Sequence, residues 1–335
     1  MTCLKARYYG RQTLSKNQKL DNIIEGCLNL TEAGANFVCL FSLMGFLGAF
    51  NWLFDICSHF RPQYFICLLF AILISLKRKR RILIVWSIIA ILNVIPILQL
   101  YVPGPPAASN SPRLKMLTMN LESINNKNYN AAAECIKTFN PDIITLQEVN
   151  YAFGNYLREH LPEYKYNKIV TGELCEGVGI MSKFPLEQIT TQQFGQNFPL
   201  ISAIAKTNIG DIEILAPHPV PPVDWDFWHQ QSIFFDGVTE LCKLRHTSLL
   251  ITGDLNATAY GYQLQHFKET SHLSDSSQGF GIQLTWPSAF PPLWINIDQC
   301  LFSDDLTAVA RKVGPDIGSD HRSLYTEIAK RKISR

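Results

Sequence analysis

Three apolar stretches within the first third of the chain constrain its fold more than any other feature. They comprise residues 37–54, 64–76 and 82–101. A membrane-spanning helix needs about 20 mostly apolar residues, so the first and third stretches are long enough. The second reaches this length only if residues 60–63 extend it and Arg61 and Lys77 reach the membrane interfaces. None of the three has a polar face for solvent, so we expect transmembrane helices at about 37–55, 61–76 and 82–101 rather than a helical hairpin buried in a soluble domain.

The distribution of charge predicts how these helices are oriented. Five consecutive basic residues, 77–81, separate the second stretch from the third, and positively charged loops remain cytoplasmic. Segment 1–35, with a net charge of +2, is then cytoplasmic as well. Three spans make a multi-pass protein of the inner or plasma membrane, with everything after residue 101 periplasmic or extracellular. If the second stretch does not span, that part of the chain is cytoplasmic instead.

A Pro-rich linker separates the apolar stretches from the rest of the chain. Four prolines occur within residues 102–112, a composition typical of extended, semi-rigid segments. We therefore expect the following domain to stay close to the bilayer. Residues 111–335 carry a net charge of −5, whereas residues 36–110 carry +5. An acidic domain is unlike most nucleic-acid-binding domains, which present a basic stripe.

The remaining chain alternates short apolar runs with turn residues, which predicts an α/β domain over 113–329 and a basic tail at 330–335. We expect strands at 114–119, 142–146, 178–181, 200–206, 212–216, 248–252, 295–302 and 323–328, and helices at 129–139 and 228–245.

Six predicted strand ends carry polar residues of the kind found in catalytic sites. They are Asn120, Glu148, His218, the pair Asp254 and Asn256, Asp298, and the pair Asp320 and His321. Binding residues of α/β proteins gather at strand ends and in the loops beyond them. Each of these short patterns also occurs in ordinary turns, but six in one domain indicate a site.

The segments around these residues resemble those of the endonuclease/exonuclease/phosphatase superfamily, the metal-dependent phosphoesterases related to DNase I. They read LTMN at 117–120, PDIITLQEV at 141–149, GVGIMSKFP at 177–185, APHPVPP at 216–222, LLITGDLNA at 249–257, TWP at 285–287, IDQCLF at 297–302 and GSDHRSL at 318–324. The resemblance covers about residues 113–329 and implies a four-layer α/β/β/α sandwich. The whole architecture is similar to membrane-anchored bacterial members of this superfamily that are linked to glycopeptide-antibiotic resistance.

The resemblance implies a metal site. Glu148 would be the principal ligand, Asn120 would support the metal or contact the phosphate, and Asp320 would contact the metal or a water molecule. Glu122 is either a second acidic group of the site or an exposed loop residue. The implied cofactor is Mg²⁺, with Mn²⁺ as the alternative, because both prefer oxygen ligands.

The resemblance also implies the catalytic roles. His321 would be the catalytic histidine, with Asp298 fixing its tautomer and orientation. Asp254 would accept a proton from the attacking water or orient it, and Asn256 would donate to a phosphoryl oxygen. His218 would contact the phosphate or assist the leaving group.

Several neighbouring residues have weaker assignments. Glu176 is a candidate to orient His218, and Gln299 stands where most family members have histidine. The other histidines match no motif, and we interpret them as structural or surface residues: His59, His160, His229, His246, His266 and His272.

Cysteine is too sparse, at nine residues, for a disulfide scaffold. Cys135 and Cys300 lie in apolar segments and are expected in the core. On an oxidising side of the membrane these two, Cys175 and Cys242 could also form disulfides, and the sequence leaves their pairing open.

The family cleaves DNA, RNA, inositol lipids and sphingomyelin, so the motifs alone leave the substrate open. The acidic domain, its tether to the bilayer and the aromatic residues beside the motifs favour a phosphoester or diphosphate of a lipid-linked or envelope substrate. These aromatics are Trp225, Phe227, Trp228, Trp286, Phe290 and Trp294, for which ordinary core packing is the alternative. A membrane-anchored nuclease acting on DNA is the second hypothesis. A catalytically silent binding module is the third, and the complete set of motif residues argues against it. No protein partner can be inferred.

Overall fold

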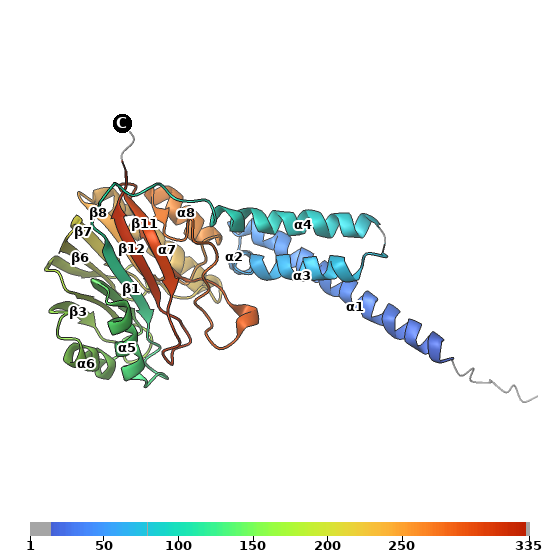
Figure 1. The fold of residues 1–335 in the computed structure, drawn as a ribbon, viewed down its shortest axis with the longest axis horizontal. Helices are drawn as coiled ribbons and strands as arrows, with labels where there is room; N and C mark the ends of the chain where they lie inside the picture. Colours follow the sequence, from blue (N-terminus) through green and yellow to red (C-terminus); the bar gives the residue numbers. More distant parts are fainter. Residues whose placement is uncertain (1–14, 79, 333–335) are drawn as a thin grey trace, which may run out of the picture.

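The computed structural model describes residues 15–78 and 80–332, which form a helical region (residues 16–99) joined to a larger α/β domain (residues 114–330) (Figure 1). The helical region consists of α1 (Lys16–Met44), the 3-10 helix η1 (Gly45–Leu47), α2 (Trp52–Ser58), α3 (Arg61–Ile74) and α4 (Arg80–Gln99). Helices α1, α3 and α4 share an apolar core that includes Cys39, Leu68 and Trp86. Two helices, α1 with η1 and α4, are long and apolar enough to cross a membrane. The pair α2 and α3, bent by 64°, is a third candidate.

The first helix starts well before residue 37 and ends at Met44, within the predicted span 37–55. It starts at Lys16 because Ser15 and Gln18 form a capping box, each side chain accepting a hydrogen bond from the other residue's backbone N–H. It ends before Gly45, where a Cβ would lie 2.9 Å from the backbone nitrogen of Ser58. Asn51 then caps α2 by accepting a hydrogen bond from the N–H of Leu53. The chain therefore reverses its direction between α1 and α3 within residues 45–60.

Arg61 is buried, which corrects the expectation that it extends to a membrane interface. Its Nη2 donates to the carbonyl of Gly45 at 3.1 Å, and its guanidinium lies 4.0 Å from the ring centroid of Phe46. Arg61 therefore fastens the start of α3 to the end of α1. Lys77 is exposed at the other end of α3. The α3–α4 connection and the start of α1 both lie at the end of the helical region remote from the α/β domain (Figure 1).

Two six-stranded mixed sheets form the centre of the α/β domain. The first has the order β11 (Leu306–Val313), β12 (Leu324–Lys330), β1 (Leu114–Asn120), β2 (Ile143–Gln147), β4 (Val178–Ser182), β3 (Tyr166–Val170). The second has the order β5 (Leu186–Gln192), β6 (Leu200–Thr207), β7 (Gly210–Ala216), β8 (Ser248–Asp254), β10 (Asp298–Phe302), β9 (Ser274–Asp275). Only β1–β2 and β7–β8 pair in parallel among these strands.

Three apolar cores separate four layers. One core lies between the sheets and contains Met116, Ile180 and Leu250. A second packs α5 (Tyr129–Phe139) and α6 (Tyr151–His160) on the first sheet, and a third packs α7 (Trp225–Leu244) and α8 (Tyr262–Ser271) on the second. The layers agree with the predicted α/β/β/α sandwich. Cys135 and Cys300 are buried as expected, and the cysteines that the structure describes all have free thiols.

Residues 102–112 lie along the α/β domain and are hydrogen-bonded to it. The N–H of Ala108 donates to the carbonyl of Lys330, and the hydroxyl of Thr307 donates to the carbonyl of Pro105. At the end of α4, the carbonyl of Leu100 accepts hydrogen bonds from the N–H groups of Gly279 and Gly281. Leu100 and the Pro-rich segment therefore fix the end of α4 to the α/β domain.

Candidate active site

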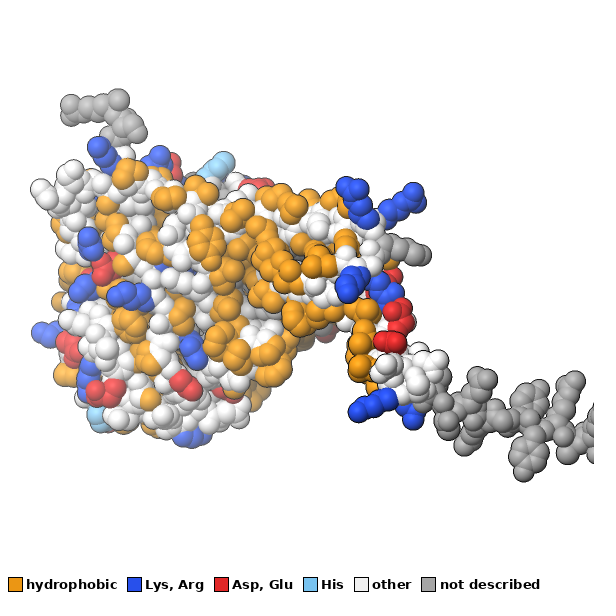
Figure 2. Space-filling model, turned by 45° about the vertical axis from the view of Figure 1, so that its right-hand side comes forward, with side chains coloured by type: hydrophobic (Ala, Val, Ile, Leu, Met, Phe, Trp, Pro, Cys, Tyr) orange, Lys and Arg blue, Asp and Glu red, His pale blue; other side chains and the backbone are white. Residues whose placement is uncertain are grey.

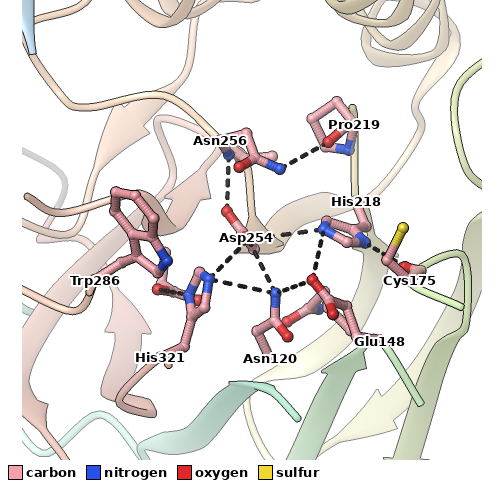
Figure 3. A network of polar contacts seen from close by, with 12 residues as sticks. Asn120, Glu148, Cys175, His218, Pro219, Asp254, Asn256, Trp286 and His321 are labelled. Carbon is pink, nitrogen blue, oxygen red and sulfur yellow. Dashed lines mark hydrogen bonds and ion pairs between the residues drawn. The ribbon is translucent and has the colours of Figure 1, made fainter. Parts of the chain in front are cut away.

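The ends of β1, β2 and β8 bring three of the predicted site residues together. The Nδ2 of Asn120 donates to Glu148 Oε1 at 3.0 Å and to Asp254 Oδ2 at 3.1 Å (Figure 3). Glu148 follows the last residue of β2 with a φ of 52°, a left-handed conformation that is uncommon outside glycine and is enriched at functional sites. Two carboxylates from different sheets therefore converge on one amide group.

A hydrogen-bonded Asp–His pair lies beside these carboxylates. Asp298 is the register partner of Asp254 in the β8–β10 ladder, and its Oδ2 accepts a hydrogen bond from His321 Nδ1 at 2.9 Å. The other ring nitrogen of His321, Nε2, lies 3.5 Å from Asp254 Oδ2. Ser319 holds the loop, because its hydroxyl donates to the carbonyl of Asn120 and accepts from the N–H of His321.

His218 faces the two carboxylates from the other side (Figure 3). Its Nε2 lies 3.7 Å from Asp254 Oδ2 and 3.9 Å from Glu148 Oε1. Its Nδ1 donates to the carbonyl of Cys175 at 3.1 Å. Glu176 does not orient this ring, since its carboxylate accepts from the N–H groups of Glu173 and Leu174. The orienting group is thus a backbone carbonyl, which motif reading could not identify.

The two histidines of the site hold protons differently. Burial lowers the pKa of His218 to about 3, so its ring is neutral, with the proton on Nδ1 and a free lone pair on Nε2. Burial also disfavours the charged form of His321, but the carboxylates of Asp298 and Asp254 outweigh it and raise its pKa to about 10. Burial raises the pKa of Asp254 and of Glu148. The site therefore combines a charged imidazolium with buried carboxylates that can accept protons.

Asp320 and Glu122 occupy the edge of the cluster. Asp320 Oδ1 lies 4.0 Å from His321 Nε2, and its Oδ2 accepts a hydrogen bond from Trp286 Nε1 at 2.8 Å. Glu122 accepts from the N–H of Asp320 at 2.8 Å and from the side chain of Asn125. Glu122 thus positions the loop of Asp320, while Trp286 belongs to the site rather than to the core.

The remaining motif residues fix the backbone around Asp254. The N–H of Asn256 donates to Asp254 Oδ1, and its side-chain amide donates to the carbonyl of Pro219. A Cβ at Gly253 would lie 2.4 Å from the carbonyl oxygen of Pro217, so only glycine fits there. Gln299, where a histidine is usual, donates to the carbonyls of Ala257 and Asn296 and stabilises the same loop.

The cluster suits a divalent cation that prefers oxygen ligands. Glu148 Oε1 and Asp254 Oδ2 converge, and both carboxylates are disfavoured by burial in a way that a cation would relieve. Within the described residues, Asp254, Asp298 and His321 also form a group whose ligand atoms lie within 4.8 Å of one another. Asn120 presents its nitrogen to the carboxylates, while its oxygen accepts from the N–H of Glu122.

A cavity of about 420 Å³ opens on this cluster. Its lining includes Glu148, His218, Asp254 and His321, but most of the other residues are apolar. They are Phe198, Pro221, Pro222, Val223, Trp286, Ile295 and Ile297 from the α/β domain, and Ile56 and Phe60 from the helical region. His59, expected to be structural or on the surface, also lines the cavity. The sequence reasoning missed this contribution of the helical region.

Comparisons with known proteins agree with this geometry. The model of the endonuclease/exonuclease/phosphatase family matches residues 117–321. Among solved structures, a family protein from Beutenbergia cavernae is similar over 65% of this chain and 72% of its own, with 17% identity and a TM-score of 0.54. D. rerio TDP2 in complex with a single-strand DNA product (15% identity, 65% and 99% coverage, TM-score 0.54) and sphingomyelinase C from Streptomyces griseocarneus (15%, 65% and 99%, TM-score 0.51) share the fold. Comparison with curated proteins found no match.

The family match spans more than half of the chain and ends on His321. It includes Asn120, Glu148, His218, Asp254 and Asp298, all brought to one place by the fold. Members of the family depend on divalent metals, in keeping with the clustered carboxylates. The chain therefore belongs to the endonuclease/exonuclease/phosphatase family and is a hydrolase that acts on phosphoester bonds.

Proposed function

We propose that this protein is a membrane-anchored, Mg²⁺-dependent phosphoesterase that hydrolyses a phosphoester or diphosphate bond of a lipid-linked envelope substrate. The observation that carries the proposal is the lining of the active-site cavity. Acidic groups and imidazoles lie together in it, and apolar side chains from both regions of the chain make up most of the rest. A substrate with a phosphate group joined to an apolar chain matches this lining, with its phosphate at the acidic groups and imidazoles and its chain at the apolar side chains.

The charge of the cavity favours a lipid over a nucleic acid as the substrate. Within the part of the chain that the structure describes, no lysine or arginine lines the cavity. Proteins that bind nucleic acid neutralise its phosphates with such residues. The acidic α/β domain, with its net charge of −5 over residues 111–335, adds to this argument. Nuclease activity is therefore an outcome to be tested rather than the function we propose.

The site residues have distinct roles in hydrolysis. Glu148 and Asp254 would hold the cation, with Asn120 and Asp320 beside them, and the bound cation would neutralise charge on the phosphate. Asp254, next to the cation, would orient the attacking water. The His321 imidazolium, held by Asp298, stabilises negative charge that develops on the phosphoryl group. The lone pair of His218 Nε2 is free to accept a hydrogen bond from the water or the substrate.

Membrane anchoring rests on the apolar surface of the helical region. Apolar side chains cover this region and continue onto the adjoining face of the α/β domain (Figure 2). At that end of the domain, the 3-10 helix η2 (Pro291–Leu293) protrudes toward the helices (Figure 1). In the segments that contain the cavity-lining residues Val223 and Ile295, the exposed apolar residues are Val223, Trp225, Phe227, Phe290 and Leu293. We place these residues at the bilayer interface, where aromatic side chains are enriched.

The orientation follows from the basic residues. The α3–α4 connection and the start of α4, which together contain the basic run 77–81, lie at the end of the helical region remote from the α/β domain (Figure 1). Positively charged loops remain cytoplasmic, so we propose that the α/β domain is periplasmic or extracellular in a bacterial cell. A substrate in the outer leaflet could then reach the cavity.

A substrate comparison tests the proposal. The full chain in detergent micelles with Mg²⁺ is given undecaprenyl diphosphate in one assay and supercoiled plasmid DNA in the other, each with and without EDTA. We expect metal-dependent release of phosphate from the lipid and no nicking of the plasmid. Metal-dependent nicking by folded protein that leaves undecaprenyl diphosphate intact would overturn the proposal in favour of a nuclease.

A further inference from the structure

Helix α2 brings residues of the helical region into the active-site cavity. Ile56 of α2 and Phe60, which follows it, line the same cavity as Asp254 and His321. We propose that Ile56 and Phe60 bind the apolar chain of the substrate next to its phosphate, which makes α2 a specificity-determining part of the active site. The inference rests on the proposed function, since it requires a lipid-linked substrate.

Asp55 shows that α2 is docked on the α/β domain rather than surrounded by lipid. This carboxylate is 1% exposed although it lies among apolar residues. Its Oδ2 accepts a hydrogen bond from Trp228 Nε1 at 3.1 Å, and its Oδ1 accepts from the N–H of Tyr262 at 2.7 Å. A carboxylate facing lipid would be costly, whereas here both oxygens have donors from α7 and α8. The hydrogen bonds therefore specify which face of α2 contacts the domain.

His59 joins α2 to the catalytic loop itself. Its Nδ1 accepts a hydrogen bond from the N–H of Thr258 at 3.2 Å and lies 2.9 Å from the Thr258 hydroxyl. Thr258 comes two residues after Asn256, whose backbone N–H donates a hydrogen bond to Asp254 Oδ1. A Cβ at residue 261 would lie 2.8 Å from Cε1 of His59, so Gly261 lets this ring approach. The position of α2 is thus fixed relative to the residues that carry out the chemistry.

The docking residues and the cavity residues of α2 differ in exposure. Asp55 and His59 are buried by their hydrogen bonds, whereas Ile56 and Phe60 are only partly buried. If α2 only docked on the α/β domain, the apolar surface of Ile56 and Phe60 would not need to remain accessible next to the buried catalytic carboxylates. An apolar chain held against that surface would be removed from water, which is the main favourable term in binding such a group.

The bend after α2 places an α/β-domain loop next to this surface. Helix α3 departs from α2 at 64°, and Gln63 Nε2 donates to the carbonyl of Trp294 at 2.7 Å. The next residue, Ile295, lines the cavity together with Val223. The apolar chain of a substrate would therefore contact α2 and this loop at once, while its phosphate contacts the catalytic cluster.

Chain-dependent kinetics test the inference. Ile56→Ala and Phe60→Ala are made in the full chain, in detergent micelles with Mg²⁺, with Ile56→Val and Phe60→Leu as milder variants. The substrates are undecaprenyl diphosphate and the water-soluble bis(p-nitrophenyl) phosphate. Leu53→Ala is the matched control, because Leu53 is on the same helix and 39% exposed, away from the cavity.

We expect each alanine variant to raise KM for the lipid about tenfold, the loss typical of removing an apolar contact, with the milder variants intermediate. Hydrolysis of the soluble ester should stay within about twofold of wild type, as should Leu53→Ala with both substrates. Equal losses on both substrates would assign α2 a structural role only and overturn the inference, as would lipid kinetics unchanged from Leu53→Ala. If the wild-type protein leaves the lipid intact, both the proposed function and this inference are wrong. If the α2 variants hydrolyse the lipid at the wild-type rate and this hydrolysis depends on His321, the proposed function stands and only the inference is wrong.

Discussion

Replacing Asp55 with alanine would remove two hydrogen bonds that join the helical region to the α/β domain. The substitution leaves the buried Trp228 Nε1–H and Tyr262 N–H without their acceptor. Hydrogen bonds to charged groups contribute about 1.5–3 kcal/mol each, so the two together stabilise by about 3–6 kcal/mol. The cost of burying the carboxylate also disappears, and we expect a net loss of about 2–4 kcal/mol in the free energy of unfolding.

This loss can be measured as a fall in Tm for the full chain in detergent micelles. At roughly 2 °C per kcal/mol for a domain of this size, Asp55→Ala should lower Tm by about 4–8 °C. Asp55→Asn keeps one carbonyl acceptor and should lose about half as much. Asp236→Ala is the control, because Asp236 is an exposed carboxylate on α7. A Tm for Asp55→Ala within about 1 °C of that control would refute the docking role of α2.

Three further predictions concern catalysis, the metal and acid stability. Asp298→Asn should lower kcat ~10²-fold or more with an unchanged Tm, because the substitution removes the negative charge that stabilises the His321 imidazolium; a near-normal kcat would refute the pairing. EDTA should abolish hydrolysis and Mg²⁺ or Mn²⁺ restore it, as activity assays with added chelator would show, and turnover that persists in chelator would remove the metal. Burial disfavours the Asp305 carboxylate, but hydrogen bonds from Lys330, Ser248 and Ser303 outweigh it and lower its pKa to about 2. The ionised Asp305 carboxylate therefore stabilises the folded state above pH ~4, and this stabilisation is lost toward pH 2. Because the side chain is 46% exposed, Asp305→Asn should remove only about 1 kcal/mol of this pH-dependent stability. Thermal melts at several pH values measure the effect, and an identical pH dependence in wild type and variant would contradict the prediction.

Buried strands were the part of the fold that the sequence predicted best. The apolar runs of β1, β2 and β8 end within two residues of the predicted positions, because central strands covered on both faces read as continuous apolar segments. Edge strand β5 was missed because its LEQITTQ sequence is largely exposed and polar. Helix α8 was missed for a similar reason, since YQLQHFKETS contains few apolar residues.

The candidate site was predictable to the extent that its residues lie in short motifs at strand ends. Asn120, Glu148, Asp254 and His321 were identified this way, and the sheets bring them within hydrogen-bonding distance or nearly so. The hydrogen bond from His218 to the Cys175 carbonyl was not predictable, because every residue has a backbone carbonyl and the residue type does not indicate which one is used.

The contribution of α2 depends on contacts between residues far apart in the sequence. His59 and Thr258 are separated by 199 positions, and Asp55 and Tyr262 by 207. One signal was present in the sequence: Asp55 is the only acidic residue of segment 36–110. An isolated carboxylate in an apolar segment indicates a buried partner, but the sequence does not say which residue supplies it.

Phosphate release from undecaprenyl diphosphate in detergent micelles with Mg²⁺ tests the central claim most directly. Wild type is compared with His321→Ala, and His246→Ala is the control, because His246 is exposed, matches no motif and does not line the cavity. We predict release by wild type and the control, and a rate at least ~10²-fold lower for His321→Ala with its Tm retained. Equal release by all three proteins would contradict the catalytic assignment, and no release by folded wild-type protein would contradict the lipid-linked substrate.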